Sequence, residues 1–228
     1  MGAGPCSDRV GELLAALADG DALRRRQAAQ DLGELGDVAA VPGLIAALAD
    51  PVVAVRESAV DGLVAVAMPE VAWQVATLLD SQDAALRNYG QEILEGLGTA
   101  SVEALMERLV SPSSDVRKFA VDVLGRIGEV SEIRATGILC GMLGDANPNV
   151  AGAAAEALGR VGDKRALPAL VQHLRGEPWL QCCVLYAIAR IGGEAALAAL
   201  ADIDSQSLLP EVAHYFVMAK HILEQRQD

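Results

Sequence analysis

The chain has 228 residues, of which 52% are hydrophobic but only 3% aromatic, and its formal net charge at pH 7 is −13. A strongly acidic surface repels nucleic acid and anionic lipid and favours basic partners. The longest uninterrupted apolar stretch, about eight residues at 182–189, is far short of the roughly 20 that a membrane span requires. We therefore expect neither nucleic acid nor a membrane among the partners.

Helical segments recur along the chain with a period of about thirty residues. Each period closes on a glycine or an alanine, and the closing residues are Gly36, Ala67, Gly98, Gly128, Gly162 and Gly192. Their spacings are 31, 31, 30, 34 and 30 residues. Such a period is typical of a repeat architecture, in which each unit buries its apolar face only against its neighbours.

Within one period the pattern is helix, turn, helix. In the second period, VPGLIAALAD (41–50) has apolar residues at helical spacing. The next segment, PVVAVRESAVDGLVAVA (51–67), begins with a proline, which the first turn of a helix tolerates. A closing glycine suits a left-handed C-cap. The predicted units, in chain order, are residues 9–36, 37–67, 68–98, 99–128, 129–162, 163–192 and a divergent C-terminal cap at 193–228, whose KHILEQRQD ending predicts a polar outer face.

These units resemble the HEAT repeats of the phycobilisome-lyase (PBS lyase) type. A second pattern strengthens the resemblance, because an acid precedes an arginine by six or seven residues in the pairs Asp19/Arg25, Asp50/Arg56 and Asp80/Arg87. In the family these side chains join adjacent repeats by hydrogen bonds at the turn between helices. The resemblance implies an all-α fold, a right-handed α-solenoid of about seven helix-turn-helix repeats that forms a single domain over residues 1–228.

Helical phase separates a buried side from an exposed side on each second helix. The position four residues before the closing residue is always a large aliphatic side chain and is predicted to lie in the core: Leu32, Leu63, Leu94, Leu124, Leu158 and Ile188. The opposite side carries an acidic column, a basic column confined to the later repeats, and several of the few aromatic residues. In solenoids of this type the second helices line the concave surface, so these columns are predicted to face a groove.

The groove columns are the candidate partner-binding site, because aromatic and arginine side chains are favoured anchors in protein recognition. Two alternatives stay open. Asp122/Arg126 and Glu156/Arg160 could be intrahelical ion pairs on a solvated face, and Tyr89 and Phe119 could pack into the seam between repeats. The candidate residues are Asp61, Tyr89, Glu92, Phe119, Asp122, Arg126, Glu156, Arg160, Trp179, Tyr186 and Arg190.

Catalytic and metal-binding patterns are not recognisable, so we expect no catalytic residue, no metal and no cofactor. His214 and His221 are seven residues apart, about 10 Å along one helix, which is too far to share an ion. HEAT-repeat hydroxylases resemble this fold and hold iron with His-Glu pairs, but each histidine here precedes Leu, Tyr or Ile. No phosphate-binding, nucleophile-elbow or zinc-protease motif occurs.

The function predicted from the sequence is that of a non-catalytic scaffold or adaptor, which binds a protein partner through the concave face. The charge is uneven, because residues 1–114 carry −10 of the net −13. The acidic N-terminal half is therefore predicted to bind a basic segment of the partner, and the mixed arginine and aromatic C-terminal half an acidic or aromatic segment. The alternative is a subunit of a bilin lyase or a chromophore-handling chaperone, since the repeat type is named for those enzymes. The four cysteines have no CxxC spacing, which favours a reducing cytoplasm, and we expect a monomer.

Overall fold

The structure is a computed structural model that describes residues 5–128, 132–175, 177–201, 203–205 and 208–225. These described ranges contain 14 α-helices, five short 3-10 helices and no strand. The helices form two compact units, residues 1–104 and residues 105–228, and each is described by itself. None of the described helices is long and apolar enough to cross a membrane.

Unit 1 is built from paired helices. They are α1 (Pro5–Asp19), α2 (Ala22–Leu35), α3 (Val41–Ala47), α4 (Val53–Val66), α5 (Pro69–Ala76) and α6 (Ala84–Gly96), and α7 (Val102–Arg108) contains the boundary between the units. Prolines stand in the first turns of α3 and α5, where a missing N–H costs no intrahelical hydrogen bond.

Unit 2 continues the same alternation. Its helices are α8 (Ser114–Gly128), α9 (Glu132–Met142), α10 (Pro148–Val161), α11 (Leu167–Gln172), α12 (Pro178–Ile191), α13 (Gly193–Ala201) and α14 (Pro210–Gln225). Prolines again stand in the first turns of α10, α11 and α12. Each predicted repeat thus holds two helices in its described part.

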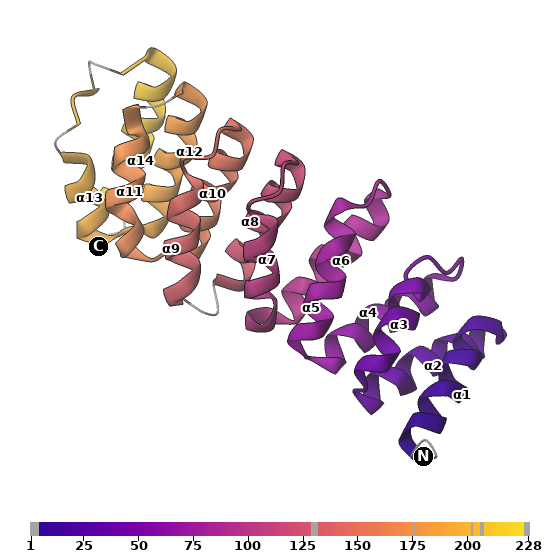
Figure 1. The fold of residues 1–228 in the computed structure, drawn as a ribbon. Coiled ribbons are helices and arrows are strands. Elements are labelled where there is room, and N and C mark those ends of the chain that lie inside the picture. The colour runs from indigo at the N-terminus through magenta and orange to yellow at the C-terminus, as the bar shows by residue number, and fades with distance from the viewer. Residues whose placement is uncertain (1–4, 129–131, 176, 202, 206–207, 226–228) are drawn as a thin grey trace. The chain divides into compact units, whose positions relative to one another are not determined.

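In both units the second helices of the pairs pack on one another and form one layer. We call this the inner layer: α2, α4 and α6 in unit 1, and α8, α10, α12 and α14 in unit 2 (Figure 1). The first helices form the outer layer, where α1 contacts α3, α3 contacts α5, and α11 contacts α13. The aliphatic residue four before each closing residue is fully buried in every repeat. The predicted fold class, an all-α solenoid of helix-turn-helix repeats, is confirmed.

Small residues let the inner helices approach almost to backbone contact. A Cβ on Gly33 of α2 would lie 2.5 Å from the Cα of Gly62 in α4. In unit 2, a Cβ on Gly159 of α10 would lie 2.9 Å from the Cα of Ala187 in α12. By contrast, a Cβ on Gly137 of outer helix α9 would meet nothing within 4 Å. The inner helices are therefore closely spaced where these small residues face one another.

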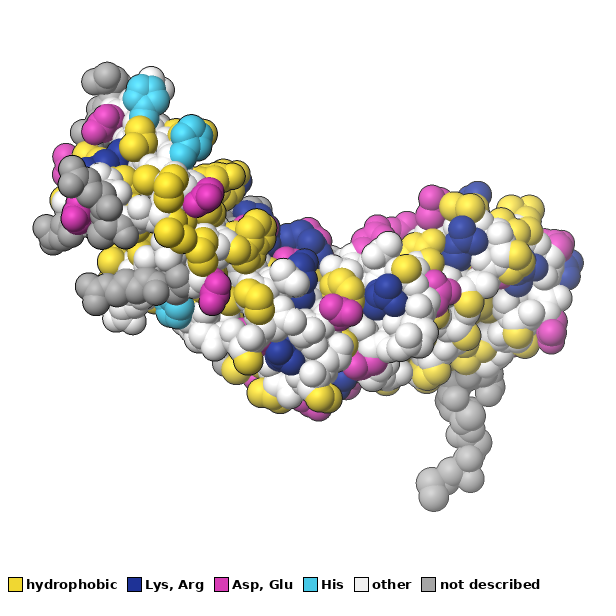
Figure 2. All heavy atoms as spheres, turned by 90° about the horizontal axis from the view of Figure 1, so that it is seen from above, with side chains coloured by type: hydrophobic (Ala, Val, Ile, Leu, Met, Phe, Trp, Pro, Cys, Tyr) yellow, Lys and Arg dark blue, Asp and Glu magenta, His cyan; other side chains and the backbone are white. Residues whose placement is uncertain are grey.

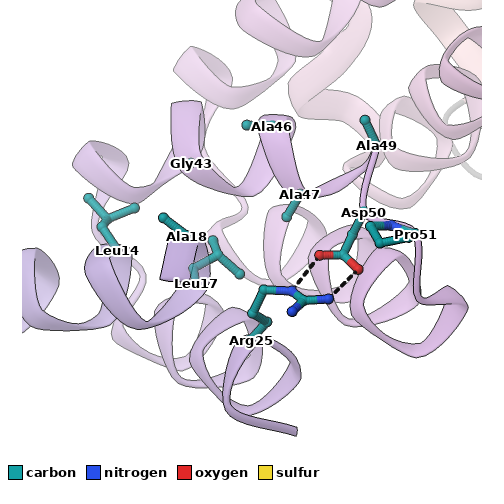
Figure 3. A pocket seen from close by; sticks show the side chains of 10 residues that line it. All are labelled: Leu14, Leu17, Ala18, Arg25, Gly43, Ala46, Ala47, Ala49, Asp50 and Pro51. Atoms are coloured by element: carbon teal, nitrogen blue, oxygen red, sulfur yellow. Dashed lines mark hydrogen bonds and ion pairs between the residues drawn. The ribbon is translucent and has the colours of Figure 1, made fainter. Parts of the chain in front are cut away.

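Arginines near the start of the inner helices form hydrogen bonds that stabilise the turns between helices. The Nε and Nη2 of Arg25 donate to the two carboxylate oxygens of Asp50 at 2.7 and 3.0 Å, which joins the first repeat to the second (Figure 3). Arg117 donates to Asp145 in the same bidentate way at 2.8 and 2.9 Å. Arginine and aspartate therefore join adjacent repeats here, as the family resemblance implies, but each of these arginines pairs with the aspartate of the following repeat and not with the side chain six positions before it.

Each of these arginines also donates a hydrogen bond to a backbone carbonyl in the turn that precedes its own helix. The Nη1 of Arg25 donates to the carbonyl of Gly20 at 3.0 Å, and that of Arg117 donates to the carbonyl of Ser111 at 2.9 Å. Arg56 donates to the carbonyl of Asp50 at 2.7 Å. One planar guanidinium donates to both oxygens of a carboxylate and to a carbonyl at once, a fixed geometry that the ammonium group of a lysine does not provide.

Acid should weaken these turns, because their carboxyl groups have lowered pKa values. Hydrogen bonds from Arg117 lower the pKa of Asp145, and those from Arg165 lower the pKa of Asp163 from 3.8 to about 2. Asp163 also accepts from the hydroxyl of Thr136 at 2.8 Å, which joins α9 to the next turn. A lowered folded-state pKa stabilises the protein above the unfolded value and loses that effect as pH falls through the folded value.

We predict that Asp163→Asn lowers the melting temperature at pH 7 and that its deficit relative to the unsubstituted protein shrinks between pH 4 and pH 2. The shrinkage follows because the native carboxyl group becomes protonated in that window. Thermal melts followed by circular dichroism at half-unit pH steps provide the measurement. Glu57→Gln, at an exposed acid of α4, is the control. A deficit that stays constant down to pH 2 would contradict the electrostatic role.

The described polar residues of the KHILEQRQD ending are largely exposed, as predicted, but the preceding turn of the cap is apolar and exposed as well. The described part of α14 exposes Tyr215, Val217 and Met218 while it buries Phe216 and Leu223. Figure 2 shows hydrophobic side chains gathered beside two histidines at this end of unit 2. The reason is that apolar residues occupy more than one side of α14, whereas its main helix neighbour is α12. The exposed apolar turn precedes the predicted polar ending, KHILEQRQD, of which residues 226–228 lie outside the described ranges.

Candidate functional site

The inner-layer face of unit 2 carries most of the predicted groove residues. Helix α12 contributes Trp179, Tyr186 and Arg190, which are spaced by seven and four residues and therefore share one side of the helix. The side chain of Trp179 is 56% exposed and that of Tyr186 is 51% exposed. Glu156 on α10 is also exposed. Exposed aromatic side chains grouped with an arginine on one side of a helix favour a binding role.

The predicted charge columns are held together across repeats. Asp122 of α8 accepts from Lys118, one turn earlier, with 2.7 Å between Nζ and Oδ2. Its other oxygen lies 3.9 Å from Nη2 of Arg160, which comes from α10 in the next repeat. The intrahelical alternative Glu156/Arg160 is therefore not the pairing adopted, because Arg160 faces Asp122. Asp122, Arg126 and Arg160 are half-buried.

Arg190 continues this cross-repeat bonding at the next seam. Its Nε donates to the carbonyl of Gly159 in α10 at 3.3 Å, and its guanidinium carbon lies 5.9 Å from the ring centroid of Tyr186. The ring and the guanidinium are one helical turn apart, so they stack along the exposed side of α12. The basic column both joins repeats and supports an exposed aromatic ring.

The remaining aromatic candidates lie deeper than the groove prediction requires. The hydroxyl of Tyr89 on α6 accepts from Nε of Arg56 on α4 at 3.0 Å, so Tyr89 fills the seam between two repeats of unit 1. Phe119 on α8 is half-buried. Asp61 and Glu92 are exposed on α4 and α6 of unit 1. Among the predicted groove aromatics, the exposed ones are therefore Trp179 and Tyr186, both on α12.

Two residues of the candidate site were not predicted from the sequence. Lys118 stands one turn before Asp122, and this i,i+4 spacing was the signal that could have identified it. Gly152 of α10 faces Trp179, because a Cβ there would lie 3.1 Å from the indole Nε1. No local sequence signal identifies Gly152, since its neighbour comes from the next repeat.

Comparison with known protein families identifies the repeat family of this chain. A model described as HEAT repeats matches residues 10–95, 102–182 and 138–207. The chain belongs to the HEAT-repeat family. The match is to HEAT repeats in general and does not distinguish the phycobilisome-lyase type.

One curated relative of this HEAT-repeat chain is a HEAT repeat-containing taxis protein of Halobacterium salinarum (strain ATCC 29341 / DSM 671 / R1), 31% identical over 157 residues. The aligned part covers 68% of this chain and 35% of that protein, so the chain spans about a third of the relative's length. Among solved structures, a Kap121p mutant aligns with a TM-score of 0.58 at 13% identity and covers 94% of this chain and 29% of its own. It supports the solenoid fold alone.

Human deoxyhypusine hydroxylase, solved with glycerol, is another similar structure, with a TM-score of 0.49 at 22% identity. The alignment covers 95% of this chain and 84% of the hydroxylase chain. In the described part of this HEAT-repeat chain, no three His, Cys, Asp or Glu residues are grouped closely enough to hold a metal ion.

The described cysteines are free thiols, and their surroundings disfavour the thiolate. Burial raises the pKa of Cys183 to about 11, with the nearby charge of Glu156 as the second cause. Burial also raises the pKa values of Cys140 and Cys182. The nucleophilic form of each is therefore disfavoured at neutral pH. The adjacent Cys182 and Cys183 fit a packing role in α12.

Proposed function

We propose that this HEAT-repeat protein is a non-catalytic scaffold or adaptor that binds a protein partner along the inner-layer face of unit 2. The observation that carries the proposal is the exposed side of α12, where Trp179, Tyr186 and Arg190 stand together on a rigid helix. Rigid aromatic side chains bury a large area with little loss of rotamer freedom. The ion pairs that support this face are made within the protein, so the surface is ready before a partner arrives.

The acidic balance of the chain defines the kind of partner. The net charge of −13 disfavours nucleic acid. On the inner-layer face of unit 2, the exposed Glu156 favours a basic segment in the partner. The taxis relative adds a setting, and we place the partner among the components of a taxis response. The free thiols support action in a reducing cytoplasm, and we propose that the protein acts as a monomer.

The test is site-specific photo-crosslinking in cells that make the protein naturally. A photoreactive phenylalanine derivative at Tyr186 should trap the partner, whereas the same group at Glu194 of outer helix α13 should not. The trapped protein is identified by mass spectrometry and its affinity is then measured with purified components. Crosslinking from Glu194 alone would move the partner to the outer layer and overturn the proposal.

We predict that Tyr186→Ala and Arg190→Glu each weaken binding of that partner at least about tenfold, because truncating a central anchor in an interface commonly costs this much or more. Isothermal titration gives the affinity, and circular dichroism confirms that the helices remain folded. The matched control is Trp73→Ala on outer helix α5, an exposed aromatic in the other layer. Equal losses in all three variants would show that the effect is not specific to α12.

The bilin-lyase alternative makes a different prediction. A chromophore-handling subunit should change the absorbance of an added linear tetrapyrrole, whereas a protein-binding scaffold should leave the spectrum unchanged. The same purified chain serves for both measurements.

A further inference from the structure

A pocket of about 170 Å³ opens on the inner-layer face of unit 2, where the first turns of three successive inner helices meet. It lies beside the exposed side of α12 but is formed mainly by α8 and α10. The side chains that bear on its chemistry are Ser114, Asp115, Lys118, Asn149, Glu156 and Trp179. Sites for drug-sized molecules have volumes of about 300–1,000 Å³. This pocket therefore fits one side chain rather than a cofactor.

Trp179 forms an aromatic wall of the pocket. Its indole lies against α10 at Gly152, because a Cβ there would be 3.1 Å from the indole Nε1 and 3.5 Å from Sγ of Cys183. The glycine therefore makes room for the ring to rest on the helix. The ring is nevertheless 56% exposed. An aromatic surface held in this way loses little conformational freedom when a ligand covers it.

The charges that line the pocket leave two carboxylates available. Lys118 is committed to Asp122, with 2.7 Å between Nζ and Oδ2. Asp115 and Glu156 have no salt-bridge partner among the described residues. The pocket thus combines two acids with the face of an indole. A cation gains both from the carboxylates and from the negative face of the ring.

We propose that this pocket binds a single lysine or arginine side chain from a basic segment of the protein partner. The proposal rests on the proposed function, since it takes the inner-layer face of unit 2 as the docking surface. The aliphatic stem of the side chain packs on Trp179, and its charged end lies near Asp115 and Glu156. Long cationic side chains bury their stems and keep their charge near polar groups in this way. Charge complementarity identifies the occupant, because an anion or a neutral side chain would leave both acids unpaired.

The two tryptophans of the chain allow a direct test. In a Trp73→Phe variant of the full chain, the indole fluorescence reports Trp179 alone. The probe is an eight-residue peptide of alternating glycine and lysine with blocked ends, titrated at about 50 mM salt to limit screening. We expect a saturable fluorescence change with this peptide. The same peptide with acetylated lysines, which have no charge, should give no change.

Variants separate the pocket from the general acidity of the protein. Titration calorimetry with the lysine peptide should show that Trp179→Leu raises the Kd at least about fivefold. Glu156→Gln and Asp115→Asn should each raise it at least about threefold. The matched controls are Glu194→Gln on α13 and Trp73→Leu on α5, which remove the same groups from the outer layers. Both controls should leave the Kd unchanged.

Three results would overturn the pocket proposal. They are the absence of saturable binding, equal binding of the acetylated peptide, and equal effects of Glu194→Gln and Glu156→Gln. The failure of the proposed function is a separate result. Tyr186→Ala could weaken binding of the natural partner while Glu156→Gln and Trp179→Leu leave that affinity unchanged. The inner layer would then bind the partner, and the pocket assignment would be wrong. If crosslinking places the partner on the outer layer, the proposed function itself fails.

Discussion

Leu158→Ala is expected to lower the free energy of unfolding by about 2–5 kcal/mol, the usual cost of truncating a fully buried leucine. Leu158 lies in α10 and has no exposed surface. Its helix packs between α8 and α12. The neighbouring Gly159 is already close to the backbone of α12. The helices therefore have little room to close around the missing methyl groups, and most of the cavity should remain.

Urea denaturation followed by the helical circular dichroism signal measures this loss. The control is Leu23→Ala, which makes the same chemical change on α2 at a side chain that is 69% exposed. A surface change of this kind should alter the free energy of unfolding by less than about 0.5 kcal/mol. Similar losses at Leu158 and Leu23 would show that the assignment of buried and exposed helix faces is wrong.

The repeat period predicted the fold well because burial in a solenoid depends on local spacing. The residue four positions before each closing residue occupies an equivalent place in each of the six repeats, so one rule places all six core aliphatics correctly. The closing residues were less uniform. Gly36 and Gly162 adopt the left-handed conformation, as does Ala67, whereas Gly128 still belongs to α8. A local signal identifies the end of a helix only to within a residue or two.

The candidate site was harder to predict, because its contacts cross from one repeat to the next. Helical spacing pairs Glu156 with Arg160, but Arg160 instead faces Asp122 on the preceding inner helix. Tyr89 has the phase of a groove residue, yet its hydroxyl accepts from Arg56. Sequence phase gives the direction of a side chain from its own helix axis. It does not give the reach of a long arginine from the next helix.

Contacts between repeats also explain how a charged surface can be conformationally ordered. Guanidinium groups contact the neighbouring repeat in the 3.9 Å ion pair of Arg160 and the hydrogen bond of Arg190. These side chains therefore lose part of their freedom during folding rather than during binding. The exposed residues that remain, Glu156, Trp179 and Tyr186, then stand on a fixed framework. A partner that binds there has less ordering entropy to overcome.

The spacing of the inner helices depends on small residues. Glycine-to-alanine substitutions should therefore lower the free energy of unfolding at some positions and raise it at others. Gly33→Ala is expected to destabilise unit 1 by about 1–3 kcal/mol, the usual cost of overpacking. The new Cβ would lie 2.5 Å from the Cα of Gly62, so one helix must move. Gly11→Ala in α1 should instead stabilise by about 0.5–1 kcal/mol, because alanine favours helix and nothing lies within 4 Å of the new methyl group.

The same pair of opposite effects is available in unit 2, at Gly159 of α10 and Gly137 of α9. Urea denaturation of the four alanine variants provides the measurement. Stabilisation by Gly33→Ala or Gly159→Ala would mean that the inner helices can separate freely and that their spacing is not fixed by these residues. Gly159→Ala should also affect the binding face, because the Gly159 carbonyl accepts a hydrogen bond from Arg190. If Gly159→Ala displaces α12, it should weaken partner binding, whereas Gly137→Ala should leave the affinity unchanged.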